Sequence, residues 1–370
     1  MSTLAVLGAS GFTGRLVAAE CHRQGHRPVV VGRDPARIRA AMADGDVEVA
    51  DIRQADVADG SALRRALADV DVLLATVGPF DRLGREVLDA AIDTGTHYVD
   101  CTGEQTFIRW AVSERDVAAR DAGVVAVPAA GFEFLPGDVL AAIAADAVAW
   151  PTQIHVAYTV PSSGRFVLRA SQGTRRTLAA HLGSLGLAFE HGELVEELPF
   201  EARRLAWFPR PVGPRHAAGI PGGEALTVPR HVPDIRTVRT YLAIPSWKAE
   251  IGQMGANATR WDPVRRVVRR FLERDAGGPS PETRAATRWG CVAEAEGQDG
   301  VARAWAYGHD VYGLTAVNMV AVAEAILTTP PLAGVTSPAA VAEPRDLLDT
   351  VAARTDLRWS VARPESGAVG

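Results

Sequence analysis

The sequence is poor in cysteine and lysine, and each shortage excludes a class of protein. Only three of its 370 residues are cysteines, and they lie far apart without a CxxC motif. This excludes a disulfide framework and a cysteine-rich zinc site, and it suits a reducing compartment. Lys248 is the single lysine and has no tyrosine four residues before it, so a catalytic Tyr-x-x-x-Lys pair is absent. The nine histidines form no HExxH motif, and we expect no metal site.

A surplus of positive charge and a long unbroken hydrophobic run are also missing. The 39 Lys and Arg residues against 44 Asp and Glu residues give a net charge of −5, which argues against a nucleic-acid partner. The longest apolar stretch, 311–327, contains Asn318 and Glu324 and is shorter than the roughly 20 residues that a membrane span needs. The N-terminal MSTLAVLGASG has the pattern of a first strand and not of a signal peptide. We therefore expect a buried helix, no transmembrane span and a cytoplasmic protein.

The order of strand and helix patterns predicts an α/β fold. A chain of 370 residues exceeds one comfortable core, so two domains are expected. Strand and helix signals alternate over the first 127 residues, which indicates βαβ units and a Rossmann-type, doubly wound parallel sheet. We predict strands at 4–7, 27–32, 47–51, 70–77, 98–101 and 124–127, and helices at 14–24, 35–42, 83–93 and 104–121, with another ending at 67.

Beyond Pro128 the pattern changes. Alternating runs such as 153–160, together with many prolines and glycines, predict an inserted α+β domain on a mixed or antiparallel sheet. Residues 191–235 have the composition of a long hairpin or a lid. We expect the final helices to return to the first domain. The predicted domains are 1–128, 129–310 and 311–370.

A glycine-rich turn, Gly8-Ala9-Ser10-Gly11-Phe12-Thr13-Gly14, joins the first strand to the first helix. Gly8 permits a tight turn, Gly11 lets a pyrophosphate approach the backbone, and Gly14 allows close packing of helix on strand. Phosphates bind the unpaired amides of such a helix start. The spacing is GxxGxxG, which differs from the commoner GxGxxG, but the strand–turn–helix context predicts a dinucleotide site.

The end of the second strand indicates which dinucleotide binds. Arg33 stands where many NAD-binding proteins carry an acidic residue, and a guanidinium suits the 2′-phosphate of NADP. We therefore favour NADPH, although the neighbouring Asp34 keeps NAD open. Asp56 is a candidate partner for the adenine amino group or, alternatively, the cap of a turn.

Ligands of doubly wound sheets bind beyond the carboxyl ends of the strands. Three segments qualify, at 76–80, 98–104 and 131–138, and each combines glycine with a polar or acidic residue. Glu104 and Glu133 are candidates for a direct chemical role, whereas Asp100 and Asp138 suit the capping of turns or helices. Near the late helix, Tyr312 follows His309 and Asp310, which suit either a proton-donor site or a helix cap.

The motifs GASGFTG, VGR, TVGPF, YVDCTGE and GFEFLPGD, in this order, resemble those of the saccharopine dehydrogenase-like superfamily, and within it the bacterial branch of trans-acting enoyl reductases. Three later stretches, at 171–174, 308–327 and 334–339, extend the resemblance. It implies a Rossmann domain completed by C-terminal helices, with an inserted domain over the nicotinamide. The cofactor residues so implied or predicted are Gly8, Ser10, Gly11, Phe12, Thr13, Gly14, Arg33, Asp56, Val77, Gly78, Pro79, Phe80, Thr102 and Gly103.

The chain departs from the family pattern GFDSxPSD at three positions. Glu133 replaces Asp, Phe134 replaces Ser, and Gly137 replaces a second Ser. We interpret Phe134 as a sign of a more apolar substrate pocket.

The resulting prediction is an NADPH-dependent oxidoreductase, an enoyl reductase acting on an apolar lipid- or polyketide-like small molecule. The candidate catalytic residues are Glu104, Glu133 and Tyr312. An imine-forming amino-acid dehydrogenase stays open because of Arg165, Arg169, Arg175 and Arg176. A regulatory protein that binds NADP(H) without catalysis also stays open, as does a homodimer.

Overall fold

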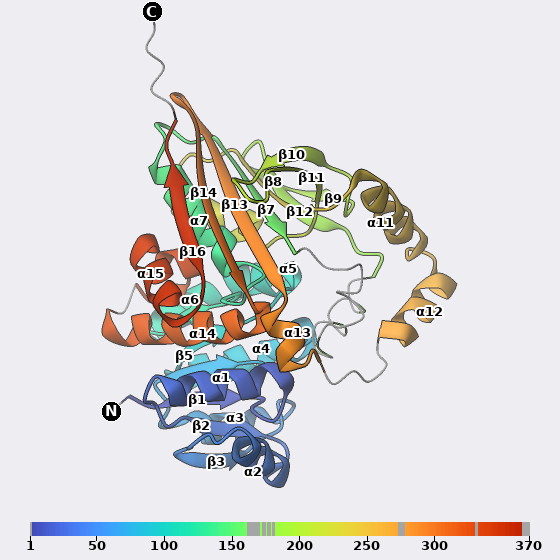
Figure 1. The fold of residues 1–370 in the computed structure, drawn as a ribbon. Coiled ribbons are helices and arrows are strands. Elements are labelled where there is room, and N and C mark those ends of the chain that lie inside the picture. Colours follow the sequence, from blue (N-terminus) through green and yellow to red (C-terminus); the bar gives the residue numbers. More distant parts are fainter. Residues whose placement is uncertain are drawn as a thin grey trace, which may run out of the picture.

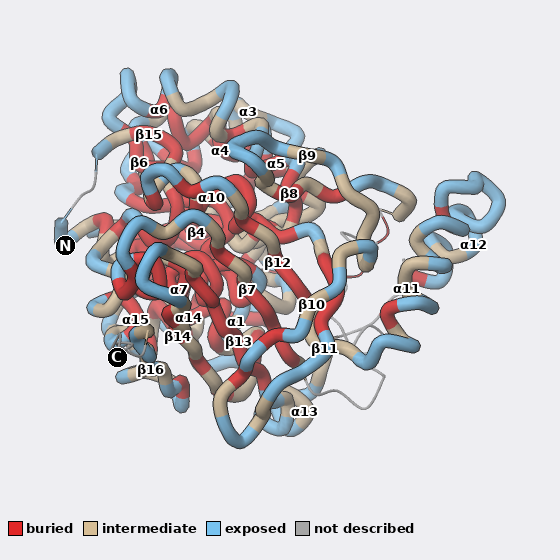
Figure 2. Tube along the Cα trace, turned by 90° about the horizontal axis from the view of Figure 1, so that it is seen from above, coloured by how far each residue is buried: buried red, intermediate tan, exposed pale blue. Residues whose placement is uncertain are grey.

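The computed structural model describes residues 2–160, 171, 175, 179, 182–272, 278–329 and 332–364. Two sheets organise the chain (Figure 1). The first carries the N-terminal third, and the second lies above it in the same view. A continuous set of buried apolar residues links the first domain, α7 (Leu135–Asp146) and the second sheet. Figure 2 shows these buried segments running through the middle of the molecule.

The first sheet has seven strands in the order β15-β6-β5-β4-β1-β2-β3, and every pairing in it is parallel. Without β15 this is the doubly wound order 3-2-1-4-5-6, which places a ligand site between β1 and β4. The predicted fold class is confirmed. The strands are β1 (Leu4–Leu7), β2 (Val29–Gly32), β3 (Asp51–Gln54), β4 (Val72–Ala75), β5 (His97–Asp100), β6 (Val125–Val127) and β15 (Gly334–Val335).

The helices of the first domain follow the predicted alternation. Two begin at aspartate caps: the Asp34 carboxylate accepts from Arg37 N at 3.0 Å, and the Asp59 carboxylate accepts from Ala62 N at 3.0 Å. The helix predicted at 104–121 is interrupted by one π-helical turn, 111–115. The helices are α1 (Phe12–Arg23), α2 (Pro35–Asp44), α3 (Gly60–Leu67), α4 (Phe80–Asp93), α5 (Gln105–Trp110) and α6 (Asp116–Asp121).

The second sheet is mixed, with the path β10-β11-β12-β7-β13-β14-β16 and with β8 and β9 paired beside it. Only β12 and β7 run parallel; the other pairings described are antiparallel. Helix α7 packs on β7, β13 and β14. The strands are β7 (Gln153–Thr159), β8 (Gly186–Glu190), β9 (Glu193–Glu197), β10 (Arg203–Trp207), β11 (Pro214–Gly219), β12 (Thr237–Ala243), β13 (Arg288–Gly297), β14 (Gly300–His309) and β16 (Arg358–Ala362).

Residues 191–235 form neither a single hairpin nor a separate lid. They contribute β9, β10 and β11 to the second sheet and then form α10 (Glu224–His231). A further helical stretch, α11 (Ser246–Ala258), α12 (Asp262–Leu272) and α13 (Pro281–Ala285), leads into β13.

The C-terminal part joins both sheets. Helix α14 (Val311–Thr328) packs against α1, β4 and β5, and β15 extends the first sheet beside β6. Helix α15 (Pro344–Arg354) packs on α14 and α7. The last strand, β16, does not return to the first domain but pairs with β14 of the second sheet.

Helix α14 is also the one described helix that is long and apolar enough to cross a membrane by length and composition. Two thirds of it (67%) is buried inside the protein, including Asn318 at 0% exposure. Its burial against α1 and the first sheet identifies it as a core helix.

Candidate functional site

The turn between β1 and α1 leaves the start of the helix without a side-chain cap. Gly8 has a φ of +86°, and its carbonyl accepts a hydrogen bond from Gly11 N at 2.8 Å. A Cβ on Gly14 would overlap the Gly8 carbonyl, so only glycine lets the helix begin this close to the strand. The first turn of α1 holds no acidic residue. This arrangement fits a bound pyrophosphate, because the amides and dipole of a helix start attract anions.

Arg33 is exposed immediately after β2, where the 2′-substituent of a dinucleotide ribose is read. Asp34 is the residue that left NAD as an alternative cofactor. Its carboxylate is the N-cap of α2, because it accepts the hydrogen bond from Arg37 N. The charge left for a ligand at this strand end is therefore the guanidinium, which fits a phosphate.

Asp56 is exposed, and its Oδ1 accepts a hydrogen bond from Ala58 N at 3.0 Å. Asp56 therefore caps a turn, which is one of the two roles predicted for it. The adenine contact stays a prediction.

The loop after β4 lies directly against the glycine turn. The Thr76 hydroxyl donates to the Leu7 carbonyl at 2.8 Å, and a Cβ on Gly8 would lie 2.9 Å from Val77 Cγ2. Val77, Gly78 and Pro79 remain partly exposed beside this turn. Phe80 instead is buried against Phe107, with ring centroids 5.7 Å apart, so its side chain belongs to the core.

Glu104 ties two helix starts together. It is 1% exposed, and its two carboxylate oxygens accept hydrogen bonds from Phe80 N and Asp81 N, each at 2.9 Å. These amides belong to the first turn of α4, where a negative charge is favourable. The geometry gives Glu104 a positioning role, holding the loop after β4 against the loop after β5, and does not favour it as a proton donor.

Asp100 organises the loop that holds Thr102 and Gly103. Its carboxylate is fully buried and accepts hydrogen bonds from the Tyr98 hydroxyl at 2.6 Å, Thr102 N at 2.8 Å and Ala129 N at 2.9 Å. Burial raises its pKa to about 6, against the effect of these donors. Asp100 therefore joins the ends of β5 and β6, in line with the predicted capping role. Thr102 is itself buried, and its hydroxyl accepts from Glu104 N at 3.1 Å.

Glu133 differs from the other acids of these loops because it is exposed. Its neighbours Phe132 and Phe134 are buried, whereas its own side chain reaches the surface beside Gly103. A Cβ on Gly103 would lie 2.8 Å from Glu133 Oε2. The carboxyl is accessible yet surrounded by protein, and this loss of hydration, with the nearby charge of Glu104, raises its pKa to about 7. An accessible acid that is half protonated near neutral pH suits proton transfer.

Tyr312 lies next to the glycine turn. Its ring meets the Phe12 ring edge-on, with centroids 5.0 Å apart, and its hydroxyl accepts a hydrogen bond from Ser171 N at 2.8 Å. Asp310 caps α14 through Gly313 N at 2.9 Å, and His309 is paired with Asp356. The helix-cap alternative thus holds for Asp310. Tyr312 is brought to the cofactor side of the site, and its catalytic role stays a prediction.

Sequence reasoning missed a buried polar cluster on α7, α10 and the second sheet. Glu224 is fully buried and accepts from the Tyr158 hydroxyl at 2.7 Å and the Thr240 hydroxyl at 2.9 Å. The Tyr158 hydroxyl also accepts from Gly137 N at 3.0 Å. Burial raises the pKa of Glu224 to about 7. The signal available in the sequence was the glycine pair before Glu224, since a Cβ on Gly222 would overlap the Thr240 side chain.

Asp138 anchors the start of α7 in the same region. It is fully buried and accepts from the Thr227 hydroxyl at 2.6 Å and from Ala339 N at 2.9 Å, and it pairs with His231 Nε2 at 2.9 Å. Burial opposes the charged form, but the charge and hydrogen bonds of these partners hold the pKa of Asp138 below its usual value. Its role is structural, but it does not cap a following turn or helix as predicted: its partners Thr227, His231 and Ala339 are distant in sequence, and α7 begins without a side-chain cap.

Two departures from the family pattern acquire a physical reason here. Phe134 is 5% exposed and packs with Ile108, Ala129 and Leu226, so it fills core space and does not line an open substrate pocket. Gly137 leaves room for the cluster, because a Cβ there would overlap Glu224 Oε1 and the Tyr158 hydroxyl.

We therefore expect Gly137→Ser to destabilise the protein by about 1–3 kcal/mol through overpacking and loss of the Tyr158 bond. Chemical denaturation would measure this. The control is Gly255→Ala within α11, where a Cβ meets nothing within 4 Å. It should be neutral or stabilising by up to about 1 kcal/mol. Equal stability of the serine variant and the parent protein would contradict the packing account.

Of the four arginines that would suit a charged substrate, the structure describes only Arg175. Arg175 is 6% exposed and donates to Leu272 O at 3.0 Å and Phe271 O at 2.7 Å, so it caps the end of α12. Arg165, Arg169 and Arg176 lie outside the described residues, as do residues 172–174 of the stretch 171–174 that extends the resemblance. Within the described chain, no group of three or more potential ligands forms a metal site.

Comparison with known proteins now adds to this geometry. Residues 4–127 match the family described as "Saccharopine dehydrogenase NADP binding domain". A protein of Arabidopsis thaliana named as a saccharopine dehydrogenase-like oxidoreductase is 31% identical over 149 residues, which cover 37% of this chain and 33% of that protein. A trans-acting enoyl reductase of Mycobacterium tuberculosis is 32% identical over 140 residues, covering 37% of this chain and 34% of the relative. The matched stretch thus spans about one third of each relative's length.

The whole fold also has a counterpart. The apo structure of an L-glutamate-forming saccharopine dehydrogenase from Saccharomyces cerevisiae aligns over 98% of this chain and 100% of its own, with a TM-score of 0.61 and 15% identity. At this identity the likeness concerns the fold alone. The matched family and the glycine turn with Arg33 agree on the cofactor, which is NADP(H).

Proposed function

We propose that this chain, whose first domain belongs to the saccharopine dehydrogenase NADP-binding family, is an NADPH-dependent reductase with Glu133 as its proton donor. The observation that carries the proposal is the accessible Glu133 carboxyl, which has a pKa of about 7 and lies beside Gly103 at the carboxyl ends of β5 and β6. This is the edge of the sheet at which a doubly wound fold binds its ligands.

When bound, NADPH would supply the hydride. The glycine turn and Arg33 would hold its phosphates, and Val77 to Pro79 with Gly103 would lie toward its nicotinamide half. Glu133 would hold a proton near neutral pH and release it to the atom of the reduced double bond that does not receive hydride. Because its side chain is exposed, solvent could then protonate it again. Backbone amides near Gly103 and Gly131 would stabilise charge that develops on a substrate carbonyl oxygen.

For the substrate we propose a conjugated enoyl group on an apolar, lipid- or polyketide-like molecule. The support is the named activity of the mycobacterial relative, which matches over 37% of this chain, together with the acid at Glu133, which suits protonation of carbon. An imine-containing amino-acid substrate would need free cations. Arg175, the one of the four candidate arginines that is described, is used to cap α12.

The cofactor preference gives a direct test. Arg33→Ala should weaken NADPH binding about 10- to 100-fold, because charge-assisted hydrogen bonds to the 2′-phosphate contribute about 1.5–3 kcal/mol. NADH binding should hardly change. Titration of intrinsic fluorescence with both nucleotides would measure the two affinities. The matched control is Arg39→Ala, at an exposed arginine within α2, and it should leave both affinities unchanged. An equal loss of affinity for NADPH and NADH would show that Arg33 does not bind the 2′-phosphate.

A further inference from the structure

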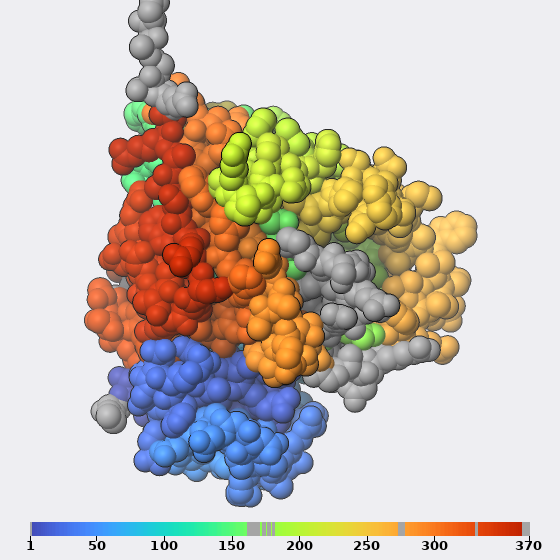
Figure 3. All heavy atoms as spheres, in the orientation of Figure 1, coloured from blue at the N-terminus to red at the C-terminus, as the bar shows by residue number. Residues whose placement is uncertain are grey.

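Helices α11 and α12 form a projecting helical pair at the edge of the second domain. They follow β12 and extend outward beyond β10 and β11 (Figures 1 and 2). The space-filling view shows residues 246–272, in yellow to gold, at the periphery of the molecule (Figure 3). None of the site residues discussed above belongs to this pair.

Helix α11 has one face against the protein and one toward solvent. Ala249 is 1% exposed, and a Cβ on Gly252 would lie 3.0 Å from the Phe200 ring, so these positions mark the packed face. Trp247, Ile251 and Met254, spaced by four and three residues, share the opposite face. They are 59%, 61% and 71% exposed. Three large apolar side chains in one stripe are thus left in water.

The apolar face of α12 is also exposed. Trp261, Val264, Val267 and Phe271 follow helical spacing and are 74%, 36%, 68% and 43% exposed. Four of the intervening positions are arginines, at 265, 266, 269 and 270, which gives the helix an apolar stripe and a basic stripe. The end of the helix is held in place, because Arg175 bonds its last carbonyls and Leu272 is buried. An exposed apolar stripe on a helix that is held in place indicates a surface that a binding partner covers.

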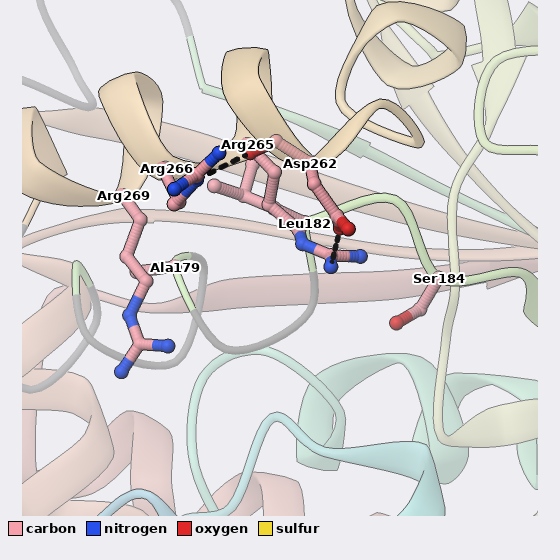
Figure 4. A pocket seen from close by; sticks show the side chains of 7 residues that line it. All are labelled: Ala179, Leu182, Ser184, Asp262, Arg265, Arg266 and Arg269. Atoms are coloured by element: carbon pink, nitrogen blue, oxygen red, sulfur yellow. Dashed lines mark hydrogen bonds and ion pairs between the residues drawn. The ribbon is translucent and has the colours of Figure 1, made fainter.

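The charge of the pair opposes that of the whole chain. Residues 246–272 contain six basic and two acidic residues, a net charge of +4 in a chain of net charge −5. Beneath α12 lies a hollow of about 680 Å³ lined by Arg265, Arg266 and Arg269 together with Ser184. In Figure 4 Arg265 and Arg269 extend from α12, whereas Arg266 lies back along the helix and donates to the Asp262 carbonyl at 3.4 Å; the Asp262 carboxylate is bonded to Arg265. The basic stripe is therefore suited to anionic groups.

We propose that α11 and α12 form a docking surface for an anionic lipid bilayer. Helices that lie in a membrane interface combine a tryptophan-containing apolar face with a basic polar face, and they bind through buried apolar area plus attraction to anionic headgroups. Both stripes are present here. The local charge of +4 is complementary to such a bilayer, whereas the remainder of the chain, at −9, would be repelled by it. The surface would bring the second domain against the membrane without a transmembrane span.

The full chain tests the proposal in sedimentation with vesicles of phosphatidylcholine alone or mixed with phosphatidylglycerol. We expect binding to the mixed vesicles, with at least tenfold weaker binding to phosphatidylcholine alone and a loss at high salt. The double variant Arg265→Gln/Arg269→Gln should lose about tenfold or more of the binding to mixed vesicles.

Two tryptophan variants separate insertion from charge attraction. Trp247→Ser/Trp261→Ser should abolish binding to mixed vesicles and the accompanying blue shift of tryptophan emission. The control Trp150→Ser removes a tryptophan that is 68% exposed on another part of the protein, and it should bind as the parent does. Thermal denaturation of each variant establishes that it is folded.

Several results would overturn the proposal. Absence of sedimentation with mixed vesicles would do so, as would binding that neither pair of substitutions changes. A third contrary result combines two observations. The parent does not bind vesicles, and gel filtration shows a concentration-dependent self-association that the tryptophan substitutions abolish. The pair would then be an interface between two copies of this chain.

Discussion

Glu133→Gln is expected to lower kcat for reduction of an enoyl acceptor by about 10²- to 10⁴-fold, the range that a positioned general acid contributes. Glutamine keeps the size of the side chain but cannot donate a proton from oxygen. Because the variant changes no residue of the glycine turn, NADPH affinity should stay within about threefold of the parent. The measurement is steady-state oxidation of NADPH, with nucleotide affinity determined separately by fluorescence titration.

The pH dependence of the same reaction provides a second readout. The pKa of Glu133 is raised to about 7, so the acid form is present below that pH and is lost as the pH rises through it. Activity of the parent should therefore fall above about pH 7, and the remaining activity of Glu133→Gln should lack this step. Glu48→Gln, at an exposed glutamate far from the site, is the control and should match the parent. A variant at position 133 that keeps full activity and the same pH profile would show that another group donates the proton.

The free energy of unfolding of the parent is expected to fall between weakly acidic and alkaline pH. In the Glu224→Gln variant this fall should be absent. The folded-state pKa of Glu224 is about 7, above the model-peptide value of 4.5, because burial disfavours the carboxylate. Its contribution to stability is fully present below about pH 4.5 and is lost as the pH rises through about 7. The size of this loss is on the order of 3 kcal/mol, since each pKa unit corresponds to about 1.4 kcal/mol.

Glutamine resembles the protonated acid and can keep both partners, accepting from Tyr158 and donating to Thr240. The variant should therefore be about as stable as the parent at pH 5 and more stable at pH 8.5, where the parent carries a buried charge. Urea denaturation at the two pH values measures the difference. If the parent and the variant lose stability equally between these values, the pKa shift does not reside at Glu224.

The first sheet was predictable because its signals are local. Most of its strands are short apolar runs followed within a few residues by a helix, and two of these helices begin at aspartate caps, Asp34 and Asp59. Boundaries erred where the local pattern was weak: β3 begins at Asp51, with exposed or half-buried residues, and lies after the predicted run at 47–51.

The second sheet could be predicted only in outline. Strand β7 pairs with β12 and β13, which follow it by more than 70 and more than 120 residues in sequence. Strands β9 and β10 carry mostly charged or exposed residues and give little period-two signal. No local pattern indicates such pairings, which depend on contacts between distant parts of the chain.

The candidate site also divides into residues that a local pattern indicates and residues whose role depends on distant parts of the chain. Glu133 was found because it follows a predicted strand, and a loop position there predicts a ligand site. The role of Glu104 could not be read from its own segment, because both amides that it accepts belong to α4, more than 20 residues earlier. Glu224 was missed because its partners Tyr158 and Thr240 are brought to it only by the packing of α10 on the second sheet.

The shared C-terminal segment has a consequence for biosynthesis. The N-terminal 127 residues leave the ribosome first, but the strand that covers the edge of β6 and the helix that covers α1 come from residues 311–335. Until these emerge, the nascent first domain exposes an open strand edge and a bare apolar helix face, both of which favour aggregation. Because β16, which lies still later in the chain, forms the edge strand of the second sheet beside β14, the two domains are not both complete before residue 362 has been translated. A chain shortened before residue 311 would therefore lack parts of both sheets.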